Sequence, residues 1–309
     1  YETNLISSIN SNDLQHTIDY TYDANGNITS IRDYSTLGGD WSYSYEYDEV
    51  GQLVRENNEY LDRTYTYTYD SGGNILTKTE YQFTEDGLEG QTHFTTTYTY
   101  GDSEWKDLLT AYDGYSITYD AIGNPTIYKY GELLTWQNGR QLATFTTDDG
   151  FLYTYKYDAN GIRTQKSGDG VTTDFYLDGA NIIGQKVNDN TMWFYYDNAG
   201  QRVALEYNGA IYYYMYNVQG DVISLIDGQG YPVVYYFYDA WGKLLDISGS
   251  MATTIGSLNP FRYRGYYYDE ESDFYYLNSR YYDPEIGRFI NSDCRFSSDI
   301  FGFNLYAYC

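Results

Sequence analysis

The sequence predicts an all-β protein made of repeated antiparallel β-hairpins, wound as a curled or spiral sheet. Three observations carry this prediction. Tyrosine supplies 44 of the 309 residues, and Tyr and Thr both favour half-buried strands. The pattern Tyr-Asp-x-x-Gly occurs seven times. Between residues 148 and 242, turn-forming residues recur about every ten residues, and such even spacing is typical of antiparallel hairpins.

The seven copies of the pattern are interpreted as hairpin corners. They begin at Tyr22, Tyr47, Tyr69, Tyr119, Tyr157, Tyr196 and Tyr238. In each copy the tyrosine ends a strand, and the aspartate at the first turn position can accept hydrogen bonds from backbone N–H groups ahead of it. The glycine at the fourth position adopts the left-handed conformation that other residues resist. The predicted corner signature includes Tyr22, Asp23, Gly26, Tyr157, Asp158, Gly161, Tyr196, Asp197, Gly200, Tyr238, Asp239 and Gly242.

The second half of the chain gives the most regular series of turns. They are expected at 148–150, 158–161, 167–170, 178–179, 188–190, 197–200, 208–209, 217–220, 227–230 and 239–242. Two strands and two turns make a unit of about 20 residues, so the chain is a repeat protein. Roughly 28 strands at about 4.8 Å each would span on the order of 130 Å. Because open sheets rarely exceed about ten strands without curling or splitting, the ribbon must curl, with two packed sheets as the alternative.

The first half is less regular. Residues 77–112 carry longer strands rich in Thr, Tyr and acidic residues, and 105–112 is expected to be a short helix or a bend. Residues 136–142 read as a degenerate corner, with Trp136 in the tyrosine position and Asn138-Gly139 turning the chain.

Together with the corners, the segment "NPFRYRGYYYDEESDFYYLNSRYYDPEIGRFINSD" (259–293) resembles the YD-repeat family, which includes the bacterial rearrangement-hotspot (Rhs) proteins and the animal teneurins. The segment is similar to the Rhs-associated core, where Arg-Tyr-Tyr-Asp-Pro-x-x-Gly-Arg-Phe recurs. Here that signature is Arg280, Tyr281, Tyr282, Asp283, Pro284, Gly287, Arg288 and Phe289. The resemblance covers essentially the whole chain.

The resemblance implies a hollow β-shell, with YD repeats over 1–250 and a truncated Rhs-associated core over 251–309. In bacterial members the shell encloses a variable C-terminal toxin that is released by self-cleavage. The expected function is therefore structural, as a shell segment of a secreted or cell-surface bacterial toxin used in competition. The expected partners are the toxin domain, absent from this chain, and the remaining N-terminal shell repeats. Asp293 lies where the first Asp-Pro-x-Gly cleavage motif is expected, but Cys294 replaces the proline, so the fragment alone should not cleave itself.

The net charge of the chain limits which other classes of partner are expected. The net charge is −26, from 44 carboxylates against 18 Lys and Arg, which argues against nucleic acid and anionic lipid. No stretch approaches 18 apolar residues, and the chain begins at Tyr1 without a signal segment. We therefore expect a soluble piece of a longer protein with no membrane insertion. Cys294 and Cys309 are interpreted as free thiols, with a disulfide as the alternative.

The candidates for chemistry are few. His16 and His93 are 77 residues apart in Thr-rich strands, and surface polar roles are expected for both. No metalloprotease, nucleophile-elbow, P-loop or dinucleotide motif occurs. A glycosidase would need two carboxylates across a sugar, but the repeated aspartates are already explained by the turns. Calcium is a less favoured hypothesis at Asp269, Glu270, Glu271 and Asp273, where no EF-hand spacing exists. No enzyme activity, metal or cofactor is expected.

Five of the 11 arginines fall within 34 residues, among Tyr and Phe: Arg262, Arg264, Arg280, Arg288 and Arg295. Since arginine stacks on aromatic rings and pairs with carboxylates, they predict a buried plug against an acidic wall. A nucleic-acid patch is the competing interpretation. The alternative to the shell is a carbohydrate- or cell-wall-binding module. Such a module needs an exposed Trp in each repeat, and Trp41, Trp105, Trp136, Trp193 and Trp241 are too few and irregular, so glycan binding is not favoured.

Overall fold

The computed structural model describes residues 5–11, 16–35, 39–293 and 304–308. The chain divides into two compact units, unit 1 (Tyr1–Thr99) and unit 2 (Tyr100–Cys309). Each unit is described by itself below. Cys294, Arg295 and Cys309 lie outside the described residues, so the predictions about them stay predictions.

Unit 1 is an antiparallel meander in which each strand pairs with the next one along the chain. Its strands are β1 (Ser8–Ser11), β2 (His16–Tyr22), β3 (Ile28–Ser35), β4 (Gly39–Tyr47), β5 (Leu53–Asn58), β6 (Arg63–Tyr69), β7 (Ile75–Gln82) and β8 (His93–Thr99). The strands carry alternating Thr and Tyr, as in "RTYTYTY" of β6, a composition that suits a pleated and half-buried surface.

Unit 2 begins with a short hairpin and continues into one sheet of fourteen strands, which we call the long sheet. The hairpin is β9 (Ala111–Tyr112) and β10 (Tyr115–Ser116). The long sheet contains β11 (Thr118–Tyr119), β12 (Pro125–Ile127), β13 (Leu133–Gln137), β14 (Gln141–Thr146), β15 (Leu152–Tyr157), β16 (Arg163–Gly168), β17 (Val171–Asp178), β18 (Asn181–Val187), β19 (Asn190–Tyr196), β20 (Arg202–Tyr207), β21 (Ala210–Tyr216), β22 (Val222–Ile226), β23 (Pro232–Tyr238) and β24 (Leu244–Ser248). Its strands follow in sequence order, so the second half forms one continuous sheet rather than two packed ones.

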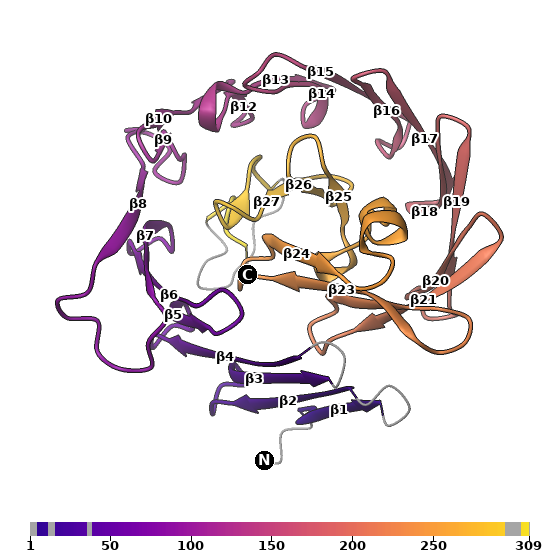
Figure 1. Cartoon of the computed structure of the whole chain (residues 1–309). Helices are drawn as coiled ribbons and strands as arrows, with labels where there is room; N and C mark the ends of the chain where they lie inside the picture. The colour runs from indigo at the N-terminus through magenta and orange to yellow at the C-terminus, as the bar shows by residue number, and fades with distance from the viewer. Residues whose placement is uncertain (1–4, 12–15, 36–38, 294–303, 309) are drawn as a thin grey trace. The chain divides into compact units, whose positions relative to one another are not determined.

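Residues 251–293, which we call the core segment, leave the long sheet after β24. They form the π-helical turn η2 (Ala252–Gly256), the 3-10 turn η3 (Tyr263–Gly265) and a small sheet of β25 (Tyr267–Asp269), β26 (Phe274–Tyr276), β27 (Tyr281–Asp283) and β28 (Arg288–Phe289). One further 3-10 turn, η1 (Lys129–Gly131), precedes β13. Within unit 2 the strands of the long sheet follow an arc around the core segment (Figure 1). We call the side of the long sheet that faces this segment its inner face.

The predicted corners are confirmed at all seven copies of the motif. In the copy at Tyr157, the Asp158 carboxylate accepts hydrogen bonds from the backbone N–H groups of Asn160 and Ile162, both at 2.9 Å. Gly161 has a φ of +84°, which a residue with a Cβ adopts only at a cost. The corner glycines of the other copies lie between +81° and +89°. In every copy the strand register shifts by one residue just before the tyrosine, so the corner also carries a bulge.

The structure also tests the remaining turns and the two irregular stretches. Each turn expected between 148 and 242 falls at a junction between consecutive strands from β14 to β24. The stretch 105–112 is a bend rather than a helix: its one regular piece is the two-residue β9. Asn138 and Gly139 turn the chain with φ of +47° and +92°. The fold is all-β and antiparallel, as predicted. The described residues include no helix long and apolar enough to span a bilayer.

Candidate functional site

The corner tyrosines have a second role that the sequence did not indicate. Each donates a hydrogen bond from its hydroxyl group to a backbone carbonyl 10 to 19 residues earlier, at 2.6 to 3.0 Å. Tyr238, for example, bonds the carbonyl of Val222, where β22 begins. Trp136 makes the equivalent bond from Nε1 to the carbonyl of Pro125 at 2.6 Å, so it does take the tyrosine position. These bonds tie each hairpin to the one before it, which phenylalanine could not do.

The core segment is the most buried part of the chain. Tyr275 and Tyr282 have no exposed surface, and with Tyr263 and Phe289 they form an aromatic cluster. The last described residues dock on the same side. Tyr308 stacks on Tyr282 with ring centroids 4.1 Å apart. The cluster is the hydrophobic anchor of the core segment on the inner face, because Tyr275 and Tyr282 also donate to backbone carbonyls near β24.

The predicted core signature forms one more corner. Asp283 accepts the N–H groups of Glu285 and Ile286, Gly287 has a φ of +75°, and Pro284 is buried between them. The flanking residues of the signature fix this corner in place. Tyr281 shares a hydrogen bond with Tyr157 at 2.8 Å, Arg280 lies over Phe289, and Arg288 bonds the Tyr100 hydroxyl and the Asp107 carbonyl.

Two buried ionic networks join the core segment to the long sheet. In the first, Arg163 of β16 forms a bidentate pair with Asp269 of β25, at 2.6 and 2.9 Å, and neither side chain has exposed surface. Lys166 bonds Asp269 at 3.0 Å and Glu271 at 2.8 Å. The Arg163 guanidinium also lies 4.1 Å from the ring centre of Tyr276. Burial opposes ionisation of Asp269, but Arg163 and Lys166 outweigh it and lower its pKa below the ordinary value.

In the second network, Lys129 of η1 lies 2.9 Å from Asp283 and 2.5 Å from Glu285. The Tyr130 hydroxyl donates to Glu285 at 3.1 Å. Burial alone would lower the pKa of Lys129, yet the two carboxylates raise it. Burial raises the pKa of Asp283, which Lys129 only partly offsets, whereas Lys129 outweighs burial at Glu285 and lowers its pKa.

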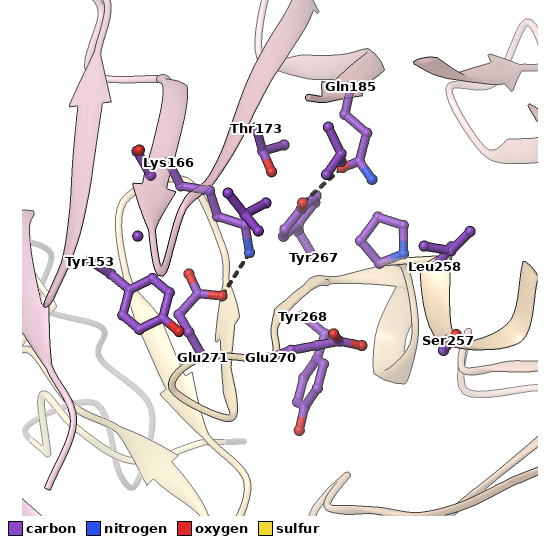
Figure 2. Close-up of a pocket in the computed structure, with 15 residues that line it drawn as sticks. Tyr153, Lys166, Thr173, Gln185, Ser257, Leu258, Tyr267, Tyr268, Glu270 and Glu271 are labelled. Carbon is purple, nitrogen blue, oxygen red and sulfur yellow. Dashed lines mark hydrogen bonds and ion pairs between the residues drawn. The ribbon is translucent and has the colours of Figure 1, made fainter. Parts of the chain in front are cut away.

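A cavity of about 330 Å³ lies between β15 to β18 and the core segment (Figure 2). Its polar lining is largely engaged by the protein itself. Lys166 bonds Glu271, and the Tyr267 hydroxyl donates to Gln185 at 2.8 Å. Glu270 pairs with Arg262 at 2.9 Å. The cavity is therefore space between the long sheet and the core segment, and its charged side chains pair with other groups of the protein.

The Arg-rich plug was expected to place arginines against an acidic wall, and this expectation is only partly correct. Arg262 and Arg288 are buried, as expected, and Arg264 approaches Asp221 of the long sheet at 3.6 Å. Arg262 and Arg280, however, pair inside the core segment, with Glu270 and Asp293. In the two buried networks the cations belong to the long sheet and η1, and the carboxylates in direct contact with them belong to the core segment. Sequence reasoning missed Lys129 of η1 and Arg163 and Lys166 of β16, and no local pattern around them indicated these pairings.

Other sequence candidates are placed as follows. His16 is not on the surface as expected: it is 2% exposed, and its Nε2 lies 2.6 Å from Asp33, because β2 packs this face inward. His93 is exposed.

The four carboxylates considered for calcium all contact protein groups: Asp269, Glu270 and Glu271 as above, and Asp273 the Tyr268 hydroxyl. Trp193 is 39% exposed, while Trp41, Trp105, Trp136 and Trp241 are half-buried. No group of three His, Cys, Asp or Glu in the described part of the chain could hold a metal ion.

Corner geometry, sequential strands and an enclosed core together define a YD-shell protein. The family described as teneurin YD-shell matches residues 3–308. The chain therefore belongs to the teneurin YD-shell family, which confirms the resemblance seen in its motifs.

Curated relatives and solved structures agree with this assignment. The tRNA3(Ser)-specific nuclease WapA of Bacillus spizizenii and the tRNA nuclease WapA of Bacillus subtilis (strain 168) are each 36% identical over 263 residues, which is 80% of this chain and 10% of theirs. The chain thus spans about a tenth of these relatives. The double-stranded DNA deaminase toxin A of Burkholderia cenocepacia is 39% identical over 56 residues, 18% of this chain and 4% of that one.

The crystal structure of TcdB2-TccC3 matches with a TM-score of 0.69 at 20% identity, over 94% of this chain and 17% of that one. The Photorhabdus luminescens Tc holotoxin pore matches at 0.56 and 19% identity, over 95% and 17%. At these identities the likeness concerns the fold.

Proposed function

We propose that this chain is part of the wall, and the internal core, of a shell that encloses a toxin domain carried farther along the same parent protein. The observation that carries the proposal is the docking of the chain's end beside the core segment. Tyr306 is 1% exposed and donates to the Gly123 carbonyl at 2.8 Å, and Tyr308 stacks in the aromatic cluster. A domain that follows in a longer parent would begin on the inner face.

The relatives support a toxin-bearing parent. The curated proteins similar to this chain include three named as tRNA nucleases and one named as a double-stranded DNA deaminase toxin. We assign such an activity to the parent's further domains and none to this chain. We assign this chain the role of a container, because the carboxylates of its buried networks are ion-paired and its corner glycines form turns. Its charge of −26 would repel nucleic acid, and the proposal includes no cofactor. A secreted or cell-surface location follows from the same proposal.

The test is limited proteolysis of the full-length parent. The part that follows residue 309 should be digested at least tenfold more slowly in the parent than when it is expressed alone. A parent with Asp269→Asn, which weakens the first ionic network, should fall between the two. Equal digestion in the parent and in isolation would overturn the container proposal.

Activity assays test the chain itself. The purified 309-residue chain should neither cleave tRNA nor deaminate double-stranded DNA, and it should not be retained on polysaccharide resins. Retention that is lost in Trp193→Ala, the variant of the exposed tryptophan, would favour the carbohydrate-binding module instead.

A further inference from the structure

The second ionic network contains more carboxylates than cations. Lys129 is 3% exposed and its ammonium group is shared by Asp283, which is fully buried, and Glu285. Glu132, three residues after Lys129, interacts electrostatically with all three of these groups. Two carboxyl groups of the core segment therefore contact this buried ammonium group, and a third, Glu132, acts on it electrostatically.

One carboxyl oxygen of the half-buried Glu132 has no protein partner in the described part of the chain. Its Oε2 atom is buried and has no hydrogen-bond partner among the residues that the structure describes, and the close contacts of Lys129 go to the other two carboxylates. Burial of this oxygen disfavours the ionised form of the carboxyl group and favours uptake of a proton. Burial accordingly raises the pKa of Glu132 to about 8, although Lys129 opposes the shift.

The groups that face Glu132 come from every element around it. Lys129 on η1 is the cation. The negative charges are Asp283 and Glu285 of the core segment and Asp148 in the turn between β14 and β15. The phenol of Tyr128 interacts electrostatically with Glu132. Lys243 and Tyr130 act on Glu132 indirectly, through Glu285. Lys243 lies 3.6 Å from Glu285, and the Tyr130 hydroxyl donates a hydrogen bond to it.

The sequence has two histidines, His16 and His93, and neither is among the groups that shift the pKa of Glu132. Histidine is the side chain that ordinarily titrates between pH 5 and 8.

We propose that Glu132 is a proton switch that sets how tightly the core segment is held on the inner face of the long sheet. Protonated, it leaves Lys129 to Asp283 and Glu285 of the core segment. Ionised, it competes with them for the same ammonium group and adds a negative charge beside theirs. The switch concerns the docking of the core segment itself and is independent of any toxin cargo.

The direction follows from proton linkage. The docked state keeps the Glu132 proton up to about pH 8, whereas the undocked state releases it near the ordinary glutamate value of about 4.3. Docking is therefore strongest below that value and weakens as the pH rises, by at most about tenfold per pH unit. Above about pH 8 the contribution of Glu132 is gone and the dependence on this group ends.

Hydrogen exchange of the 309-residue chain tests the proposal. Protection factors of the amides in β27 and β28 would be measured from pH 5.5 to 8.5 in the wild type, in Glu132→Gln and in Glu104→Gln, an exposed glutamate of unit 2. In the wild type and in Glu104→Gln, protection should fall at least tenfold across this range. In Glu132→Gln, which is permanently neutral, it should change less than threefold. Equal pH dependence in Glu132→Gln and the wild type would overturn the proposal.

The wild-type chain provides a readout that does not depend on how the variant folds. Carbon-13 NMR of the glutamate carboxyl groups should show one group in the folded chain that titrates near pH 8. If every glutamate titrates below about pH 6, Glu132 holds no proton at neutral pH and the proposal is wrong.

Discussion

Replacing Asp269 by asparagine tests whether ionic networks hold the core segment in place. The substitution keeps the size of the side chain and removes its charge. The bidentate pair of Arg163, at 2.6 and 2.9 Å, then loses its negative charge and one of its two acceptor oxygens, and Arg163 has no exposed surface through which water could replace them. Lys166 keeps its bond to Glu271 at 2.8 Å.

The magnitude follows from that geometry. Removing one partner of a buried ion pair costs about 3–5 kcal/mol, because an uncompensated charge remains inside the protein. The ring of Tyr276, 4.1 Å from the guanidinium, retains part of the stabilisation of Arg163. We therefore expect a loss near the lower limit, about 3 kcal/mol, which corresponds to roughly a hundredfold loss of protection against hydrogen exchange.

Native-state hydrogen exchange of the amides in β25 and β26 measures this loss inside unit 2, without assuming that the two units unfold together. The matched control is Asp40→Asn in unit 1, read from the amides of β3 and β4, the strands that carry Arg32 and Asp40. Arg32 and Asp40 also form a bidentate pair, at 3.1 and 2.8 Å, but their side chains are 61% and 54% exposed. Its effect should lie within the error of the measurement, because exposed pairs contribute little.

The pH dependence adds a second check. Since Arg163 and Lys166 outweigh burial and lower the pKa of Asp269, the stability that its charge provides is present above the ordinary aspartate pKa of about 3.9 and is lost as the pH falls through the lower, folded value. The difference between the wild type and Asp269→Asn should thus persist from pH 5 to 8 and shrink below about pH 4. If Asp269→Asn costs no more than Asp40→Asn at pH 7, the core segment is held by its aromatic contacts and not by this network.

Two further substitutions test the repeat. Gly200 has a φ of +81°, and no atom lies within 4 Å of the point that a Cβ would occupy there, so Gly200→Val should cost about 1 kcal/mol or more through backbone strain alone. The control is Gly228→Val, because Gly228 also lies in open space but has no positive φ. Equal melting temperatures of the two variants would contradict the corner geometry. Tyr238→Phe removes the donor to the Val222 carbonyl and should cost about 1 kcal/mol in urea unfolding, whereas Phe at the exposed Tyr213 should have no measurable effect.

Much of the fold could be predicted because the corner is a local structure. Asp158, Asn160, Gly161 and Ile162 lie within five consecutive positions, and their hydrogen bonds need nothing from the rest of the chain. The strands between corners then pair with their sequence neighbours, so the order of the long sheet follows from the spacing. The degenerate corner at Trp136 was predicted in the same way, from its local sequence. Its hydrogen bond to the Pro125 carbonyl could be seen only in the structure.

The candidate site was less predictable, because its contacts join distant parts of the chain. Asp269 and Asp283 both follow tyrosines in the core segment, and nothing in their neighbours shows that one will meet Arg163 and the other Lys129. His16 was placed on the surface because its neighbours are polar, but the face of a strand that is buried depends on what packs against it.

By itself the sequence determined the hairpin corner, its period, the all-β class and the family, since each rests on residues a few positions apart. Only the tertiary structure decided that Lys129, Arg163 and Lys166 would each contact a carboxylate of the core segment. Arg163 and Asp269 are separated by 106 residues, and their pairing depends on how far the long sheet curves before the chain turns back across its inner face. That curvature is the sum of small twists over many strands, which no local pattern of residues specifies.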